Sequence, residues 1–122
     1  MRTKNKIGVM AGLHADRPCF NEVRKLPDRT CQLYSWSSEL WTEALAKRVR
    51  REAQRAKVHI TAFWAGWSGP IVWDLVDGPL TLGLVPPAYR AQRIETLKRA
   101  GDFARALGVP AVITHLGFIP EN

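Results

Sequence analysis

Short apolar runs alternate with longer amphipathic stretches along this chain. Four of the runs have the length and apolar content of strands, and they cover 7–13, 30–36, 58–67 and 111–114. Apolar and polar positions do not alternate strictly within the first run, which is typical of a strand buried on both faces. The pattern therefore predicts four strands, with the first one covered on both sides.

A long amphipathic helix is predicted between the second and third strands. Ser37 and Ser38 are candidate N-caps, and the helix is expected to continue to Lys57. Apolar residues in it recur at spacings of four, four, four and three, which gives one narrow buried stripe. The stripe consists of Trp41, Leu45, Val49, Ala53 and Ala56.

A second long helix is predicted over 88–107, and Gly108 is a natural residue to end it. Its buried stripe is expected to hold Ile94, Leu97, Gly101 and Ala104. A shorter helix is expected over 18–26, where Pro27 would stop it.

The segment 68–87 is predicted to be a long connection, because glycine and proline recur throughout it. Loops of about twenty residues are uncommon in compact domains and often cover a site. Asp74 and Asp77 are expected to form turns here, in preference to binding a metal. Trp73 is expected to anchor the loop to the body of the protein.

Strands and helices thus follow one another in the order β-α-β-α-β-α-β. Such alternation implies right-handed crossovers and a parallel sheet. Two architectures fit this order: part of an open doubly wound sheet, or the first half of an eight-stranded α/β barrel. Gly8 and Gly12 do not form the GxGxxG pattern that usually follows the first strand of a dinucleotide-binding sheet.

Composition is that of an ordinary globular domain. The chain has 122 residues, of which 46% are hydrophobic and 24% charged. Cys19 and Cys31 lack metal-binding spacing and are too few for a disulfide scaffold, so a cytoplasmic location is expected. No apolar run approaches the ~20 residues of a membrane span, and no signal peptide or membrane partner is expected.

The positive charge is concentrated on the first long helix. The net charge is +7, and much of it comes from Lys47, Arg48, Arg50, Arg51, Arg55 and Lys57. We interpret this face as the solvated outer side of an α/β layer, with a phosphate-binding surface as the alternative. No aromatic residue lies among these arginines, as single-stranded nucleic acid binding would require, so a nucleic acid partner is not favoured.

Rings and titratable groups are concentrated just after the predicted strands. Parallel strands point their carboxyl ends to one edge, where ligands bind in both architectures. Flat rings beside hydroxyl groups suit a sugar-like ligand, which stacks its C–H faces and shares its hydroxyls in hydrogen bonds. The residues at this edge are His14, Asp16, Ser35, Trp36, Ser37, Trp64, Trp67, Ser68, Thr114, His115 and Glu121.

Each candidate also has a structural interpretation. His115 is a metal ligand, a donor to a substrate oxygen, or a loop histidine bonded to nearby backbone. Trp36 and Trp67 are stacking surfaces or plugs of a barrel. Glu121 is a catalytic acid or merely an acid in the first turn of a helix, and His14 is a further ligand contact. His59 lies at the opposite end of its strand and is expected to be structural.

Three segments resemble a known family. They read KIGVMAGL (6–13), CQLYSW (31–36) and DGPLTLGLVPPAYRAQRIETLKRAGDFARALGVPAVITHLGFIPEN (77–122), and THLGFIPEN is the most specific string. The chain resembles the N-terminal half of bacterial sugar phosphate isomerase/epimerase proteins of the xylose-isomerase-like TIM-barrel superfamily, which also holds apurinic endonucleases. The fold class implied is α/β, a parallel βαβαβαβ half of a TIM (β/α)8 barrel, with residues 1–122 as a single half-barrel.

The resemblance also implies a reaction. In the family, a divalent metal (Mn, Mg, Co or Zn) assists proton transfer beside a sugar carbonyl, and later strands supply the metal ligands and two glutamates. Those positions are absent from this sequence, so neither a metal ligand nor a catalytic residue is expected here, and the chain alone is expected to be inactive. The substrate-binding residues implied are Trp36, Trp67, His115, His14 and Glu121. By position, His115 resembles a metal-binding histidine of the endonuclease branch.

A sugar or a sugar-phosphate-like small molecule is the expected partner. A homo-oligomer formed through the half-barrel edges, or a separate C-terminal half, would cover the exposed strands. Two other functions stay open: a DNA-repair relative of the apurinic endonucleases, and a non-catalytic interaction module.

Overall fold

The computed structural model describes residues 5–119. Its strands are β1 (Gly8–Gly12), β2 (Thr30–Ser35), β3 (His59–Ala65) and β4 (Val112–Ile113). They form one sheet in the order β1-β2-β3-β4, and every neighbouring pair is parallel. Sheet order thus follows chain order, as it does around a TIM barrel. The predicted fold class, an α/β half of such a barrel, is confirmed.

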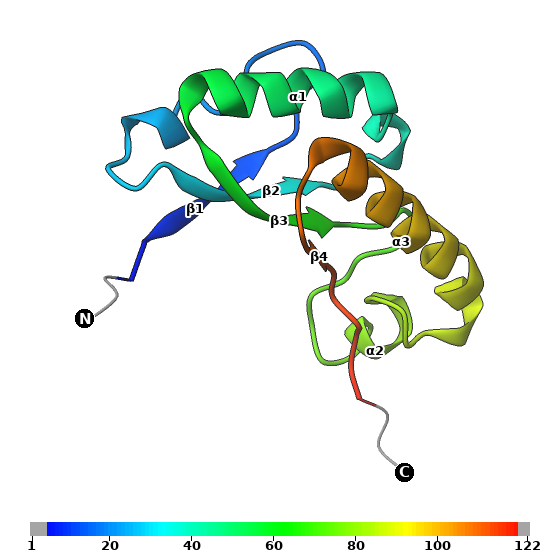
Figure 1. Cartoon of the computed structure of the whole chain (residues 1–122). Helices are drawn as coiled ribbons and strands as arrows, with labels where there is room; N and C mark the ends of the chain where they lie inside the picture. Colours follow the sequence, from blue (N-terminus) through cyan, green and yellow to red (C-terminus); the bar gives the residue numbers. More distant parts are fainter. Residues whose placement is uncertain (1–4, 120–122) are drawn as a thin grey trace.

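Two long helices cover one face of the sheet. They are α1 (Glu43–Ala56) and α3 (Pro87–Leu107), and the single turn α2 (Gly78–Thr81) precedes α3. Figure 1 shows α1 crossing over the strands, and α2 beside the chain that leaves β4. Two 3-10 turns, η1 (Val23–Lys25) and η2 (Ser38–Leu40), lie in the connections before and after β2. Within residues 5–119, no helix is both long and apolar enough to cross a lipid bilayer.

The hydrophobic core lies between the helices and this face of the sheet. The Phe63 ring of β3 is fully buried and meets the rings of Trp41 and Phe103 at centroid distances of 5.4 and 5.0 Å. Leu33 of β2 and Val49 of α1 are also fully buried. Burying an aliphatic or phenyl side chain of this size stabilises a fold by ~1.5–3 kcal/mol.

The opposite face of the sheet is largely open. Side chains of adjacent strands that share a register position point to the same face. Tyr34, Trp64 and Ile113 are paired in this way, and Met10 lies on the same face of β1. We call Met10, Tyr34, Trp36, Trp64 and Ile113 the inner face; Met10 is 52% exposed, and Tyr34, Trp36 and Ile113 are 36–37% exposed.

The prediction that the first strand is buried on both faces is wrong. Gly8, Val9 and Met10 are exposed, and burial begins only at Ala11. The physical reason is that β1 has a single strand neighbour within the described residues, and nothing there covers its inner side.

The first long helix begins later than predicted. Thr42, in place of Ser37 or Ser38, is its N-cap, and the Thr42 hydroxyl accepts the N–H of Leu45 at 3.2 Å. Residues 38–40 form the 3-10 turn η2 instead. The predicted stripe is largely confirmed, because Trp41, Val49 and Ala53 are buried while Leu45 and Ala56 are half-buried.

The predicted buried stripe of α3 is confirmed in part, because Ala104 is buried and Leu97 is half-buried against the core. Ala100, Phe103, Ala104 and Leu107 are buried together with Arg93, whereas Ile94 is 38% exposed and Gly101 is exposed. The predicted stop is confirmed, because Gly108 adopts a left-handed φ of 78°. The buried face of α3 is thus displaced by about one residue and includes Arg93, which is 2% exposed.

The helix expected over 18–26 is reduced to η1. The backbone N–H groups of Cys19 and Phe20 donate to the Glu52 side chain at 2.8 and 3.1 Å, outside any helical pattern. The connection between β1 and β2 is thus held by the Glu52 carboxylate of α1, and not by the hydrogen bonds of a helix within the connection.

Candidate functional site

Five rings gather where β2, β3 and β4 end. We call Trp36, Trp64, Trp67, Trp73 and His115 the aromatic rim. Ring centroids lie 4.7 Å apart for Trp36 and Trp64, 5.2 Å for Trp36 and Trp67, and 6.4 Å for Trp67 and His115. Most of these contacts are edge-on or tilted, the geometry that the charge distribution of aromatic rings favours. The rim follows the carboxyl ends of the strands, the edge at which TIM barrels bind their ligands.

Trp36 is placed by Gly66, which directly follows β3. A Cβ atom built on Gly66 would lie 2.4 and 2.6 Å from the Trp36 ring, closer than atoms can approach. The backbone N–H of Gly66 also donates to the Ser35 carbonyl at 2.9 Å. The missing side chain therefore lets the indole lie across the end of β3, where it is 36% exposed.

Trp67 lies behind Trp36 and is only 3% exposed. Its ring offers little surface to a ligand and packs against the Trp36 ring. On its other side lies the guanidinium of Arg93, whose Cζ is 5.3 Å from the Trp67 centroid and 4.6 Å from that of Tyr89. Such cation–π contacts are stronger when they are desolvated.

Arg93 fixes the long connection beneath the rim. Its Nη1 donates to the Thr81 and Gly83 carbonyls at 2.6 and 2.7 Å, and its Nη2 to those of Ser68 and Pro70 at 3.5 and 3.2 Å. The side chain is 2% exposed, and burial lowers the pKa of Arg93 from its usual value. The loop is therefore tied at both of its ends to one buried cation.

The residue that anchors the long connection is Arg93 and not Trp73. Trp73 was expected to anchor the loop, but its ring is 58% exposed and stands edge-on to His115 at 5.1 Å. Arg93 is the anchor. The turn predicted at Asp74 is confirmed, because its Oδ1 accepts the N–H groups of Val76 and Asp77 at 2.9 and 2.7 Å. These bonds lower the pKa of Asp74.

His115 is oriented by the backbone that follows it. Its Nδ1 accepts the N–H of Gly117 at 3.0 Å. In the neutral ring the proton must then be on Nε2, so that nitrogen is a hydrogen-bond donor. Of the interpretations left open above, this geometry favours a donor to a ligand oxygen over a metal ligand.

The exit of β4 is braced on the end of the long connection. The Leu116 carbonyl accepts the N–H groups of Leu84 and Val85 at 2.7 and 2.9 Å. Gly83 permits this approach, because a Cβ on it would lie 2.2 Å from the Leu116 backbone. Beside His115 is a hollow of about 360 Å³, to which Trp73, Leu82 and Phe118 contribute.

His14 lies apart from these rings, on the side of β1. An ideal Cβ on Gly12 would lie 3.2 Å from the His14 ring and 3.5 Å from the Tyr34 hydroxyl, so the two groups flank the same inner-face position. The Nε2 of His14 is also 3.3 Å from Nη2 of Arg17. Glu121, the remaining predicted site residue, lies outside the described residues.

The residues of the rim do not fit a metal ion. Across residues 5–119, no group of three or more His, Cys, Asp and Glu side chains is arranged to hold one. Nδ1 of His115 already accepts the backbone N–H of Gly117.

Sequence patterns missed two contributors to the site. Gly66 was hidden within the strand run, and Arg93 in a helix full of solvated charges. The signal available for Arg93 was its spacing, since it lies seven residues before Ala100 on the buried face. Trp64 was noted at the strand end, and the structure places it in the rim.

Comparison with known proteins finds similarity to solved structures. The sequence matches no family model and no curated protein. A solved structure of similar fold is that of a xylose isomerase domain protein from Planctomyces limnophilus, with a TM-score of 0.82 and 32% identity. The match covers 94% of this chain and 41% of that one. The resemblance of this chain to the xylose-isomerase-like TIM-barrel superfamily is thus confirmed in three dimensions.

Proposed function

We propose that the aromatic rim binds a sugar or sugar phosphate, as the substrate-facing part of an isomerase- or epimerase-like barrel. The observation that carries this proposal is the grouping of the Trp36 and Trp64 rings with the Nε2–H of His115 at the carboxyl ends of adjacent strands. An indole face takes the C–H side of a pyranose ring, and a fixed donor takes a hydroxyl or carbonyl oxygen.

The residues of the rim have different roles in this proposal. Trp36 is the contact surface, because it is 36% exposed. Trp67 is a positioning residue, because its buried ring keeps Trp36 in place. His115 donates from Nε2, and Trp73 closes the side of the hollow next to it. His14 and Tyr34 extend the site toward β1.

Turnover is a separate proposal. The chain spans 41% of the length of the solved relative, so the activity of a whole barrel does not follow from this part. We propose that proton transfer beside a sugar carbonyl depends on a divalent metal and carboxylates supplied by further strands, and that this chain alone binds without turnover. We also propose a cytoplasmic location, which the free thiols of Cys19 and Cys31 support.

Titration with simple sugars tests the binding site. Indole N–H resonances can be followed by NMR while xylose, glucose or fructose 6-phosphate is added. We expect the Trp36 and Trp64 signals to shift, and Trp36→Ala to weaken binding by roughly fivefold to tenfold. Trp41→Phe is the matched control, since it removes an indole that is buried between α1 and the sheet. Equal binding by wild type and Trp36→Ala would disprove the proposed contact.

An isomerase assay tests the proposal on turnover. With added manganese, magnesium or cobalt, the chain alone should not interconvert aldose and ketose. Robust turnover that Trp36→Ala abolishes would refute the binding-only role while leaving the sugar site intact.

A further inference from the structure

A pocket unrelated to the aromatic rim lies on the outer side of the sheet. It has a volume of about 580 Å³ and is enclosed by α1 and the connection between β1 and β2. It reaches Arg29 and Ala56, which lie just before β2 and at the end of α1, toward the amino ends of the strands. The proposed sugar site is at the carboxyl ends, so the two are distinct.

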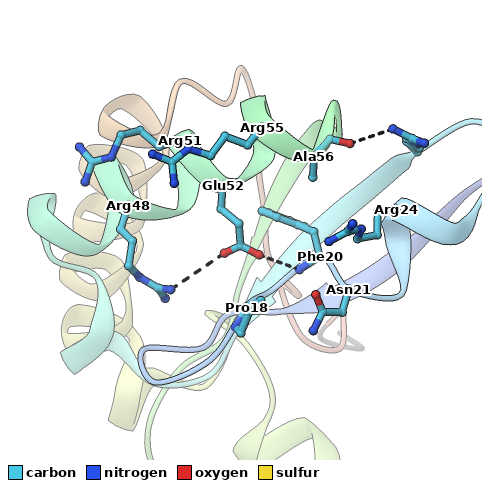
Figure 2. A pocket seen from close by; sticks show the side chains of 10 residues that line it. Pro18, Phe20, Asn21, Arg24, Arg48, Arg51, Glu52, Arg55 and Ala56 are labelled. Carbon is cyan, nitrogen blue, oxygen red and sulfur yellow. Dashed lines mark hydrogen bonds and ion pairs between the residues drawn. The ribbon is translucent and has the colours of Figure 1, made fainter.

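The walls of this pocket carry five guanidinium groups and one carboxylate. The arginines are Arg24, Arg29, Arg48, Arg51 and Arg55, and the carboxylate is that of Glu52. Figure 2 shows Glu52 in the middle, Arg48 and Arg24 on either side of it, and Arg51 and Arg55 along α1. A concave surface lined by charges of one sign concentrates counter-ions near it.

Structural contacts account for only part of this charge. Arg29 donates to the Ala56 carbonyl at 3.2 Å, and Arg48 donates to the His14 carbonyl. Arg24, Arg51 and Arg55 have no carboxylate within salt-bridge distance among residues 5–119. Three guanidinium groups from two elements therefore face the pocket without an internal counter-ion.

The single carboxylate is occupied by the protein itself. Oε1 of Glu52 accepts the N–H groups of Cys19 and Phe20, and Oε2 lies 4.0 Å from Nη1 of Arg48. Two buried polar atoms in the same place lack partners within the described chain, namely Nε of Arg48 and Oε2 of Glu52. Both atoms are covered by protein, so the capacity of the pocket for an anion rests on the unpaired guanidinium groups of Arg24, Arg51 and Arg55.

We propose that this pocket binds a diphosphate-type oxyanion. Guanidinium groups hold phosphate oxygens through paired, charge-assisted hydrogen bonds, which lysine cannot reproduce. Arg29 and Arg48, which already donate to backbone carbonyls, contribute positive charge to the walls. Arg24 from one wall and Arg51 and Arg55 from the other neutralise the remaining charge.

A half-open hollow of this size suits a small anion better than a nucleic acid backbone. A duplex would need basic residues spread along an open surface, and a single strand would need exposed rings. Phe20 is the ring in this pocket, and it is 1% exposed.

Calorimetric titration with inorganic pyrophosphate, ADP and duplex DNA tests the proposal. Pyrophosphate should bind, and the double variant Arg24→Gln/Arg51→Gln should weaken binding on the order of tenfold or more. Arg50→Gln is a control for charge loss on the same helix: it removes one charge where the double variant removes two, and its guanidinium lies against Gly108 outside the pocket. That control should retain affinity within about twofold.

The three titrants also separate the sources of a diphosphate. ADP binding as tightly as pyrophosphate would support a site that reads only the diphosphate, and tighter ADP binding would support a nucleotide. Pyrophosphate affinity that falls equally in the double variant and in Arg50→Gln would overturn the proposal, because it would mean general attraction to a basic helix. Duplex binding that pyrophosphate does not displace would overturn it as well.

Circular dichroism spectra and thermal unfolding curves of the wild type and the double variant show whether the variant still folds. The side chains of Arg24 and Arg51 are exposed, so the double variant should unfold near the wild-type temperature. Pyrophosphate should raise that temperature for wild type and not for the double variant, because a ligand stabilises only the state that binds it.

Discussion

At the scale of single residues, Arg93 links the loop, the helix and the aromatic rim. Among residues 5–119 its buried charge has no carboxylate partner, a costly arrangement that is tolerated because four carbonyls and two rings surround it. A buried cation of this kind fixes the arrangement of the atoms around it.

Replacement of Arg93 tests this role. We expect Arg93→Met to lower the free energy of unfolding by about 2–4 kcal/mol, since it leaves buried carbonyls without donors. Arg105→Met, on the same helix, removes only an exposed ion pair to Asp102 and should change stability by less than about 1 kcal/mol. Urea unfolding of both variants measures the difference. Equal stabilities would show that water replaces the guanidinium without loss.

Cys31 makes a second residue-scale prediction. The side chain is 1% exposed, and burial, with a smaller effect from Cys19, raises the pKa of the Cys31 thiol to about 11 from its ordinary 9.0. The folded chain therefore holds this proton more tightly than the unfolded chain does. The resulting stability, up to ~3 kcal/mol, is fully present below pH ~9 and is lost as the pH rises toward ~11.

Thiol chemistry and pH-dependent unfolding measure this effect. The folded protein should react slowly with an aromatic disulfide reagent at neutral pH, and both cysteines should react after denaturation. Cys31→Ala is the control for alkaline unfolding, because it should lose part of the decline above pH 9. Rapid reaction of Cys31 in the folded state would contradict its burial.

At the scale of elements, glycine positions decide where the rings lie. Gly66 leaves room for Trp36, and Gly83 lets the end of the long connection approach Leu116. The helices and strands set the framework, and these two close approaches determine how the loops between them present the aromatic rim.

Alanine substitution separates this effect from general helix and strand preferences. Gly66→Ala should displace the Trp36 ring, lower stability by about 1–3 kcal/mol and weaken sugar binding. In contrast, Gly101→Ala in α3 has free space around the new methyl group and should stabilise the chain by roughly 0.5–1 kcal/mol. Unfolding free energies and tryptophan fluorescence report both changes. Unaltered fluorescence in Gly66→Ala would mean that Trp36 accommodates the methyl group.

Sequence patterns predicted the helices and strands better than they predicted the contacts between them. The order of strands and helices, the end of α3 at Gly108 and the turn at Asp74 follow from local rules of periodicity, positive φ and side-chain acceptors. The exposed face of β1 could not be predicted, because burial depends on what other elements cover. Nor could the partners of Arg93, which lie 10–25 residues away and are backbone carbonyls that any sequence provides.

At the scale of the whole molecule, the open inner face is the dominant feature. Met10, Tyr34, Trp36 and Ile113 expose apolar surface together, and β1 and β4 are the edge strands of the described sheet. Unpaired edges and exposed apolar surface both favour association with another chain.

We expect the 122-residue chain to self-associate through this face. Sedimentation velocity should show a concentration-dependent increase in mass, and Met10→Lys should shift it toward monomer. Leu75→Lys, at a loop position that is 83% exposed, is the control and should leave association unchanged. A stable monomer at micromolar concentration would refute this expectation.

The hydrogen bonds of Glu52 also have a consequence for the order of folding. They join α1 to amides 33 and 32 residues earlier in the chain, and the segment between β1 and β2 contains only the turn η1 as local structure. Such a segment gains little before α1 exists and docks, so it closes late. In native-state hydrogen exchange, the amides of Cys19 and Phe20 should therefore open at a free energy above the low value usual for a loop and no higher than that of the middle of α1.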